Sequence, residues 1–139
     1  MFEKIKNFRL LIIITIMLVG FGVLAMTPQN KPNVNKKPSV LSIELIKNDI
    51  ANNGQLIDVR TSEEYAAGHI DGSINLSLQD IQAGKYPTAA KDKPIYIYCR
   101  SGNRSGQAKT LLKSSGYKNI TDLGAIAYVQ SLGGIIKKS

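Results

Sequence analysis

The feature that most constrains the fold is the run IYIYC at residues 95–99, in which apolar and aromatic side chains follow one another almost without interruption. A strand with one face in water alternates polar and apolar residues, whereas a continuous run is typical of a strand buried on both faces of a parallel sheet. Helices must then cover both faces of that sheet. A polar, glycine-containing loop and a helical pattern follow the run directly, as expected in an α/β domain.

The rest of residues 40–139 alternates strand and helix patterns around this run. Short strands are expected at residues 55–60, 73–78, 95–99 and 119–123, and helices at residues 44–52, 63–67, 105–115 and 125–132. Ser42 and Ser62 are placed to cap the first two helices, and Gly68 and Gly116 to end the second and third. Strands separated by short helices imply right-handed crossovers. We therefore predict a single α/β domain, a parallel β-sheet with helices on both faces.

A segment of different character precedes this domain. Lys4, Lys6 and Arg9 lie before an uncharged apolar run at residues 10–26, an arrangement typical of a secretory signal or a membrane anchor. As a helix the run would extend roughly 25 Å, which is marginal for a hydrocarbon core near 30 Å. Residues 1–26 are therefore predicted to form a hydrophobic helix, either a cleaved signal peptide or a single-pass anchor. Residues 27–39 are expected to be a flexible Pro/Asn/Lys linker.

Both alternatives put the domain outside the cytoplasm, either anchored to the membrane or exported to the cell envelope or periplasm. The chain has 139 residues, a formal charge of +8 and one cysteine. One cysteine excludes a disulfide within the chain and a site built from several thiolates. The basic residues are spread and are not interleaved with aromatic ones as on a single-strand binding surface. No nucleic-acid partner is predicted, although a basic surface attracts small anions.

The single cysteine, Cys99, lies at the end of the central strand, where α/β sheets bind ligands. Gly102 allows a positive φ, so that consecutive N–H groups point inward, and the following helix adds its positive end. Arg100 and Arg104 add two full charges. Such surroundings lower the pKa of a thiol and bind an anion. We predict Cys99 as a catalytic nucleophile, and as substrate-binding residues Arg100, Ser101, Gly102, Asn103, Arg104 and Ser105.

Two stretches, LIDVRTSEEYAAGHIDGSINLSL and IYIYCRSGNRSGQA, resemble the signatures of the rhodanese, or sulfurtransferase, superfamily, and most of all its small exported single-domain members. The resemblance covers residues 40–139 and implies a rhodanese-like domain there. The first signature corresponds to Asp58-Val59-Arg60, Glu64-Tyr65, Gly68-His69-Ile70 and Gly72-Ser73-Ile74-Asn75, with Ser73 in place of an alanine. Ser77 replaces a frequent proline, and Gly124-Ala125 with Tyr128 replace a closing Gly-Gly and Trp.

The resemblance also implies roles for residues outside the loop. His69 is expected to be a packing and hydrogen-bonding residue of the scaffold rather than a general base, because the loop itself activates the thiolate in this family. Asp58, Arg60 and Glu64 are expected to form a structural charge network at the ends of strands and helices.

The activity implied by the resemblance is that of a thiosulfate sulfurtransferase. Cys99 would take a sulfane sulfur from thiosulfate or a similar anion, carry it as a persulfide, and pass it to cyanide or a thiol, with no metal or cofactor. A cysteine phosphatase or arsenate reductase is a weaker alternative, since phosphatase loops have one residue more between Cys and Arg than the four that separate Cys99 from Arg104. A non-catalytic or slow sulfur-carrier or partner-binding module is the other alternative.

Overall fold

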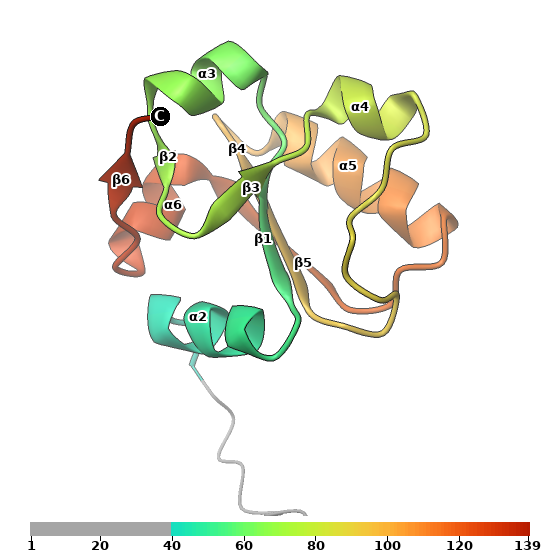
Figure 1. Ribbon diagram of the computed structural model, residues 1–139, viewed down its shortest axis with the longest axis horizontal. Helices are drawn as coiled ribbons and strands as arrows, with labels where there is room; N and C mark the ends of the chain where they lie inside the picture. Colours follow the sequence, from blue (N-terminus) through green and yellow to red (C-terminus); the bar gives the residue numbers. More distant parts are fainter. Residues whose placement is uncertain (1–39) are drawn as a thin grey trace, which may run out of the picture. The chain divides into compact units, whose positions relative to one another are not determined.

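A four-stranded sheet is the centre of residues 40–139, the part of the chain that the computed structural model describes (Figure 1). Its strands lie in the order β3 (Ser73–Asn75), β1 (Gln55–Asp58), β4 (Ile95–Cys99) and β5 (Ile120–Ala125). Every neighbouring pair in this sheet is parallel. The predicted parallel sheet is therefore confirmed, and β1 and β4 are its two inner strands.

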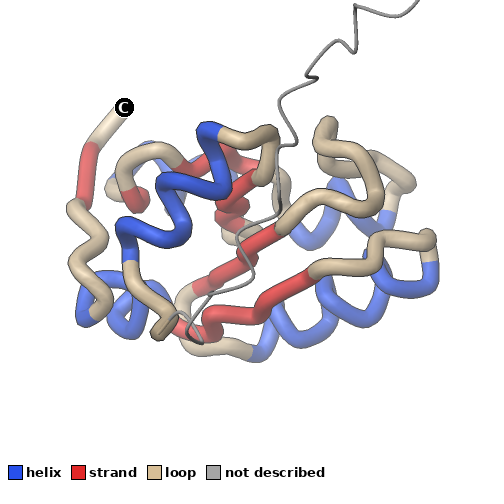
Figure 2. Tube along the Cα trace, turned by 90° about the horizontal axis from the view of Figure 1, so that it is seen from below, coloured by secondary structure: helices blue, strands red, loops and turns tan. Residues whose placement is uncertain are grey.

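Helices pack on both faces of the sheet, as the view in Figure 2 shows. On one face, α4 (Leu78–Gln82) and α5 (Asn103–Ser114) cover a buried cluster. On the other face, α2 (Ile43–Ala51) and α6 (Ile126–Ser131) cover a second one. The first cluster consists of Ile57, Val59, Leu78, Ile81, Ile95, Ile97, Cys99, Ala108, Leu112, Tyr117 and Ile120, and the second of Ile43, Ile46, Leu56, Ile70, Tyr96, Tyr98, Leu123 and Val129.

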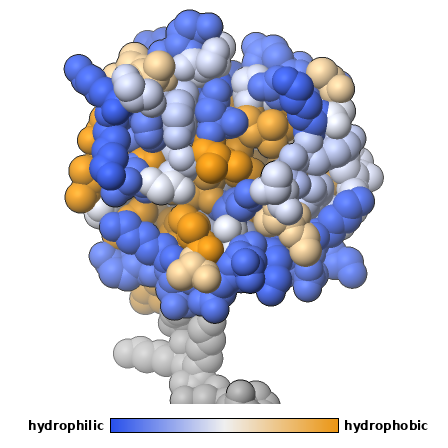
Figure 3. All heavy atoms as spheres, in the orientation of Figure 1, coloured by the Kyte–Doolittle hydropathy of each residue, from blue (hydrophilic) through white to orange (hydrophobic). Residues whose placement is uncertain are grey.

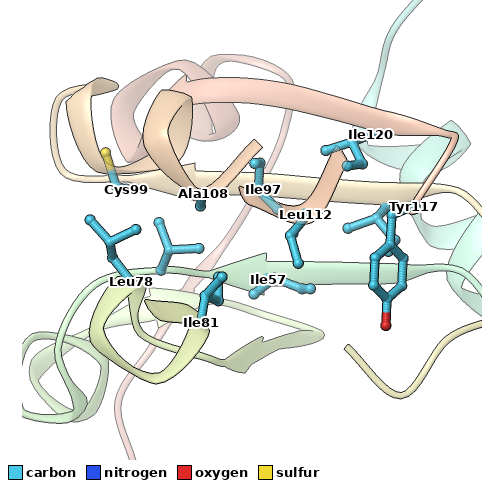
Figure 4. Close-up of a cluster of buried hydrophobic side chains, with 11 residues drawn as sticks. Ile57, Leu78, Ile81, Ile97, Cys99, Ala108, Leu112, Tyr117 and Ile120 are labelled. Atoms are coloured by element: carbon cyan, nitrogen blue, oxygen red, sulfur yellow. The ribbon is translucent and has the colours of Figure 1, made fainter. Parts of the chain in front are cut away.

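Strand β4 supplies side chains to both clusters because successive residues of a strand point to opposite faces. Ile97 and Cys99 belong to the first cluster, drawn in Figure 4, whereas Tyr96 and Tyr98 belong to the second. All five residues of β4 are buried, as the uninterrupted apolar run predicted. Cys99 is the last of them, so the packing of the sheet fixes the position of its backbone.

The first helix is capped as expected, and the second is not. The side chain of Ser42 accepts a hydrogen bond from the N–H of Leu45 at the start of α2. The cap of α3 (Ser62–Ala67) is Thr61 rather than Ser62, which is the first residue of the helix. Thr61 and Glu64 form a capping box, in which each side chain accepts a hydrogen bond from the other residue's N–H. This reciprocal pair satisfies two backbone N–H groups at the start of the helix. It places the cap one residue earlier than the expected Ser62.

The strand expected at residues 73–78 was predicted too long, because β3 ends at Asn75. Ser77 is instead the cap of α4, and its hydroxyl forms a capping box with Asp80. Leu78 is therefore the first residue of α4, and its side chain belongs to the first cluster. The third expected helix begins at Asn103 rather than at residue 105, because its cap is Gly102.

A small second sheet joins β2 (His69–Ile70) to β6 (Ile136–Lys137) in antiparallel pairing, and neither strand was predicted. Such short strands carry too little periodic pattern to be recognised from sequence. Within residues 40–139, no helix is both long enough and apolar enough to cross a membrane. The hydrophobic helix predicted at residues 1–26 and the linker predicted at residues 27–39 lie outside the described residues.

On the face drawn in Figure 3, the surface of the described domain is mostly hydrophilic. Apolar areas lie among the charged and polar side chains of that face. The large hydrophobic side chains that are exposed come from several segments of the domain, and they are Val40, Ile74, Tyr86, Tyr128, Ile135 and Ile136. Exposure of separate apolar side chains is common on protein surfaces.

Candidate active site

Cys99 lies at the carboxyl end of β4 and is only 1% exposed. The loop that follows turns back over its sulfur, and the N–H of Gly102 donates a hydrogen bond to Sγ at 3.0 Å. This turn requires the left-handed backbone of Gly102, which has φ +103°. Ser105, in the first turn of α5, lies with its Oγ 3.7 Å from Sγ. The loop therefore brings a backbone donor and a hydroxyl to the same sulfur.

These contacts change the acidity of the thiol. Burial alone raises the pKa of Cys99, since it disfavours the charged form. Hydrogen bonding with Ser105 and with the N–H groups of Gly102 and Ser101 outweighs burial, and the pKa of Cys99 lies below its ordinary value. Cys99 is thus disposed to react as a thiolate. The donors are mainly backbone groups, whereas the sequence had also pointed to the charges of two arginines.

Ser105 also holds the loop closed. Its side chain is fully buried, and its hydroxyl donates a hydrogen bond to the carbonyl oxygen of Gly102 at 3.0 Å. The N–H of Gly102 contacts the sulfur, and the hydrogen bond from Ser105 holds the carbonyl oxygen of the same glycine. Ser105 thereby links the start of α5 to the turn that surrounds Cys99.

Arg104 is engaged by a residue from another element. Its guanidinium forms a bidentate ion pair with Glu64 of α3, with Nη1–Oε2 at 2.5 Å and Nη2–Oε1 at 2.9 Å. The hydrogen bonds from Arg104, assisted by the Thr61 N–H and by the charges of Arg104 and Arg60, lower the pKa of Glu64 to about 2 against the opposing effect of burial. Glu64 is thus ionised throughout the physiological range. This contact joins α3 to the loop, and sequence reasoning did not pair the two residues.

The other three predicted substrate-binding residues differ in their surroundings. Arg100, Ser101 and Asn103 are exposed at the loop surface. The side chain of Asn103 accepts a hydrogen bond from Gln107 at 2.6 Å. The structure therefore gathers Ser101, Gly102 and Ser105 around the sulfur, and leaves Arg100 facing solvent.

A buried charge pair supports the strand that lies next to the loop. Asp58 is fully buried and accepts hydrogen bonds from the N–H of Arg60 and from its guanidinium, the shortest at 2.6 Å. The guanidinium also donates to the carbonyl of Gly68 at 2.6 Å. Arg60 lies 5.9 Å from the ring centre of Tyr98 on β4. These contacts are those of a structural network, as expected for Asp58 and Arg60.

His69 and Tyr98 belong to the same scaffold. The ring of His69 stacks on Tyr65 with centroids 3.8 Å apart, and its Nδ1 lies 3.0 Å from the carbonyl of Tyr65. The hydroxyl of Tyr98 accepts from the N–H of Ile70 and pairs with Ser73, both at 3.0 Å. Sequence reasoning missed this role of Tyr98, although a tyrosine inside a buried run needs a partner for its hydroxyl.

Fold and loop together define an α/β domain whose single cysteine lies buried at the end of a parallel strand and receives a backbone N–H on its sulfur. The chain belongs to the rhodanese-like domain family, because the family profile described as "Rhodanese-like domain" matches residues 42–125. This match includes β1, the Cys99 loop and α5. The resemblance to the superfamily is thus confirmed.

Individual sulfurtransferases and a solved rhodanese structure are also similar to this chain. The thiosulfate sulfurtransferase PspE of Escherichia coli (strain K12) is 38% identical over 72 residues, which are 50% of this chain and 68% of that protein. A sulfurtransferase of Allochromatium vinosum is 38% identical over 79 residues, covering 54% of this chain and 71% of that protein. A solved structure described as "rhodanese with anions from E. coli" has a TM-score of 0.53 and 30% identity, over 62% of this chain and 99% of that one.

Proposed function

We propose that this protein is a sulfurtransferase that moves a sulfane sulfur from thiosulfate, or a similar anion, to a thiophilic acceptor through a persulfide on Cys99. The observation that carries the proposal is the Cys99 loop, in which the buried sulfur receives the N–H of Gly102 at 3.0 Å and lies beside the Ser105 hydroxyl. The similarity to proteins named as sulfurtransferases in two bacteria supports the same activity.

The first half-reaction forms the persulfide. The Cys99 thiolate attacks the outer sulfur of thiosulfate, a new S–S bond forms, and the original S–S bond breaks with its electron pair leaving on sulfite. Charge balances, since a thiolate and a dianion give a persulfide anion and the sulfite dianion. The N–H groups that hold the thiolate are positioned to hold the persulfide anion as well.

The second half-reaction releases the sulfur. Cyanide attacks the outer sulfur of the persulfide, takes it as thiocyanate, and leaves the Cys99 thiolate; a thiol acceptor would take it as a new persulfide. Arg100, which is exposed at the loop, is the side chain most available to attract the incoming anion. A similar solved structure is described as a rhodanese with anions, which supports an anionic donor for this chain.

A turnover assay on the full-length protein in mild detergent tests the proposal. With thiosulfate and cyanide we expect thiocyanate and sulfite in equal amounts. Cys99→Ser should abolish both products, whereas Ser114→Ala, an exposed change at the far end of α5, should not. Sulfur loading of Cys99 without thiocyanate release would favour the carrier alternative. The absence of both sulfur loading and thiocyanate release would overturn the proposal.

We also propose the cellular arrangement indicated by the sequence. Residues 1–26 are a signal peptide or single-pass anchor, residues 27–39 a linker, and residues 40–139 a domain outside the cytoplasm. The support is the order of charges and apolar residues at the start of the chain. Protease added to spheroplasts should digest the domain, and full protection of a full-length cytosolic chain would contradict the arrangement. The intact mass of the recovered protein distinguishes cleavage from anchoring.

A further inference from the structure

The ion pair between Glu64 and Arg104 is placed where it can affect the reaction. Glu64 lies at the third position of α3 and Arg104 in the first turn of α5. The pair therefore joins the starts of two helices near the carboxyl ends of the strands, where Cys99 lies. Both carboxylate oxygens are used by the guanidinium. The two side chains are 30% and 26% exposed, so the pair faces solvent on one side only.

Arg104 directly precedes a residue that contacts the reacting sulfur. The next residue, Ser105, lies with its hydroxyl 3.7 Å from Sγ of Cys99. The pKa of Arg104 is raised first by its hydrogen bonds to Glu64, against burial, and then by the charges of Glu64 and Cys99. The thiolate therefore experiences the field of Arg104. It does so in the presence of an equal and opposite charge on Glu64.

We propose, resting on the proposed sulfurtransferase function, that Glu64 is a specificity-determining residue which neutralises Arg104 and so lowers the preference of the site for doubly charged sulfur donors over singly charged ones. A cation attracts an anion in proportion to the anion's charge. A neutral ion pair at the same place removes most of that dependence. With Glu64 ionised, the N–H donors of the loop, which favour either donor, dominate binding.

Two donors of matched chemistry separate charge from reactivity. Thiosulfate is a dianion, and methanethiosulfonate is a monoanion with the same outer sulfur. In each case the Cys99 thiolate bonds to the outer sulfur and the S–S bond of the donor breaks. The electron pair leaves on sulfite in the first case and on methanesulfinate in the second. The two reactions therefore differ mainly in the charge of the donor and of the leaving group.

The test compares Glu64→Gln with Glu63→Gln. Glutamine keeps an oxygen that can accept the Thr61 N–H, so the capping box of α3 is preserved. Glu63→Gln removes the same charge from the neighbouring position, where the side chain is exposed and bonded to Ser62 instead of an arginine. It is thus the matched control for a general change in net charge.

For Glu64→Gln we expect the KM for thiosulfate to fall about tenfold, the effect of one released charge-assisted contact. The KM for methanethiosulfonate should fall only about threefold, because half the donor charge gives half the free energy. Glu63→Gln should change neither of these two KM values. In an Arg104→Gln background the effect of Glu64→Gln should disappear, since the residue acts through Arg104.

Equal changes in both KM values, or no change in either, would overturn the inference. Calorimetric binding of the two anions to Cys99→Ser protein, with and without Glu64→Gln, gives the same comparison without turnover. If the wild-type protein turns over neither donor, the proposed function fails, and these binding constants still decide the role of Glu64. Equal gains in affinity for the two anions would count against it.

Discussion

Replacing Gly102 with alanine tests the link between loop geometry and the chemistry of Cys99. Gly102 has φ +103°, a conformation that costs an L-residue about 1–2 kcal/mol. A Cβ there would have Gly124 Cα as its nearest neighbour, at 3.6 Å, which is an ordinary contact. The expected cost therefore comes from backbone strain and not from a clash. Relaxation of that strain would move the Gly102 N–H away from Sγ.

Gly72→Ala is the matched control, because Gly72 has φ +81° and open space around the added Cβ. Both variants should lose about 1–2 kcal/mol of unfolding free energy in urea titrations. Only Gly102→Ala should raise the pKa of Cys99, followed by the ultraviolet absorbance of the thiolate as pH rises. Its sulfur-loading rate at neutral pH should fall about tenfold or more, as expected for a lost hydrogen bond to a charged group. An unchanged thiol pKa in Gly102→Ala would refute the reasoning.

Two further predictions concern the charge pairs. Asp58→Ala should cost about 3–5 kcal/mol in urea unfolding, because it leaves the buried guanidinium of Arg60 without its partner. A loss no larger than that of Asp71→Ala, which breaks a more exposed ion pair with Lys137, would contradict this. The pKa of Glu64 is about 2 in the folded chain and about 4.3 in an unfolded one. Its stabilising effect is therefore full above about pH 4.3 and is lost as pH falls through about 2. The stability difference between wild type and Glu64→Gln should shrink over that range, and a difference independent of pH would exclude this origin.

The sequence predicted the parts of the fold that depend on local patterns. The uninterrupted apolar run fixed β4 at residues 95–99, and its last residue is the cysteine at the strand end. Ser42 was recognised as a cap because capping acts within one turn. The positive φ of Gly102 was likewise expected from the residue type. Each of these is decided by residues close together in the chain.

What the sequence missed depends on contacts between distant residues or on competition between two local patterns. Glu64 and Arg104 are separated by 40 positions, and only the fold brings their helix starts together. The pairing of β2 with β6 is non-local in the same way. At residues 73–78 an alternating pattern predicted a strand, but the capping box of Ser77 with Asp80 ends it and begins α4.

The central claim, that Cys99 carries the transferred sulfur, is tested most directly by mass spectrometry of the full-length protein after brief exposure to thiosulfate without acceptor. We expect the peptide containing Cys99 to gain the mass of one sulfur atom. Cyanide should then remove that mass and form one thiocyanate per loaded chain. The Cys99→Ser protein should gain nothing. Thiocyanate formation without any sulfur on Cys99, or an equal rate in Cys99→Ser, would contradict the account.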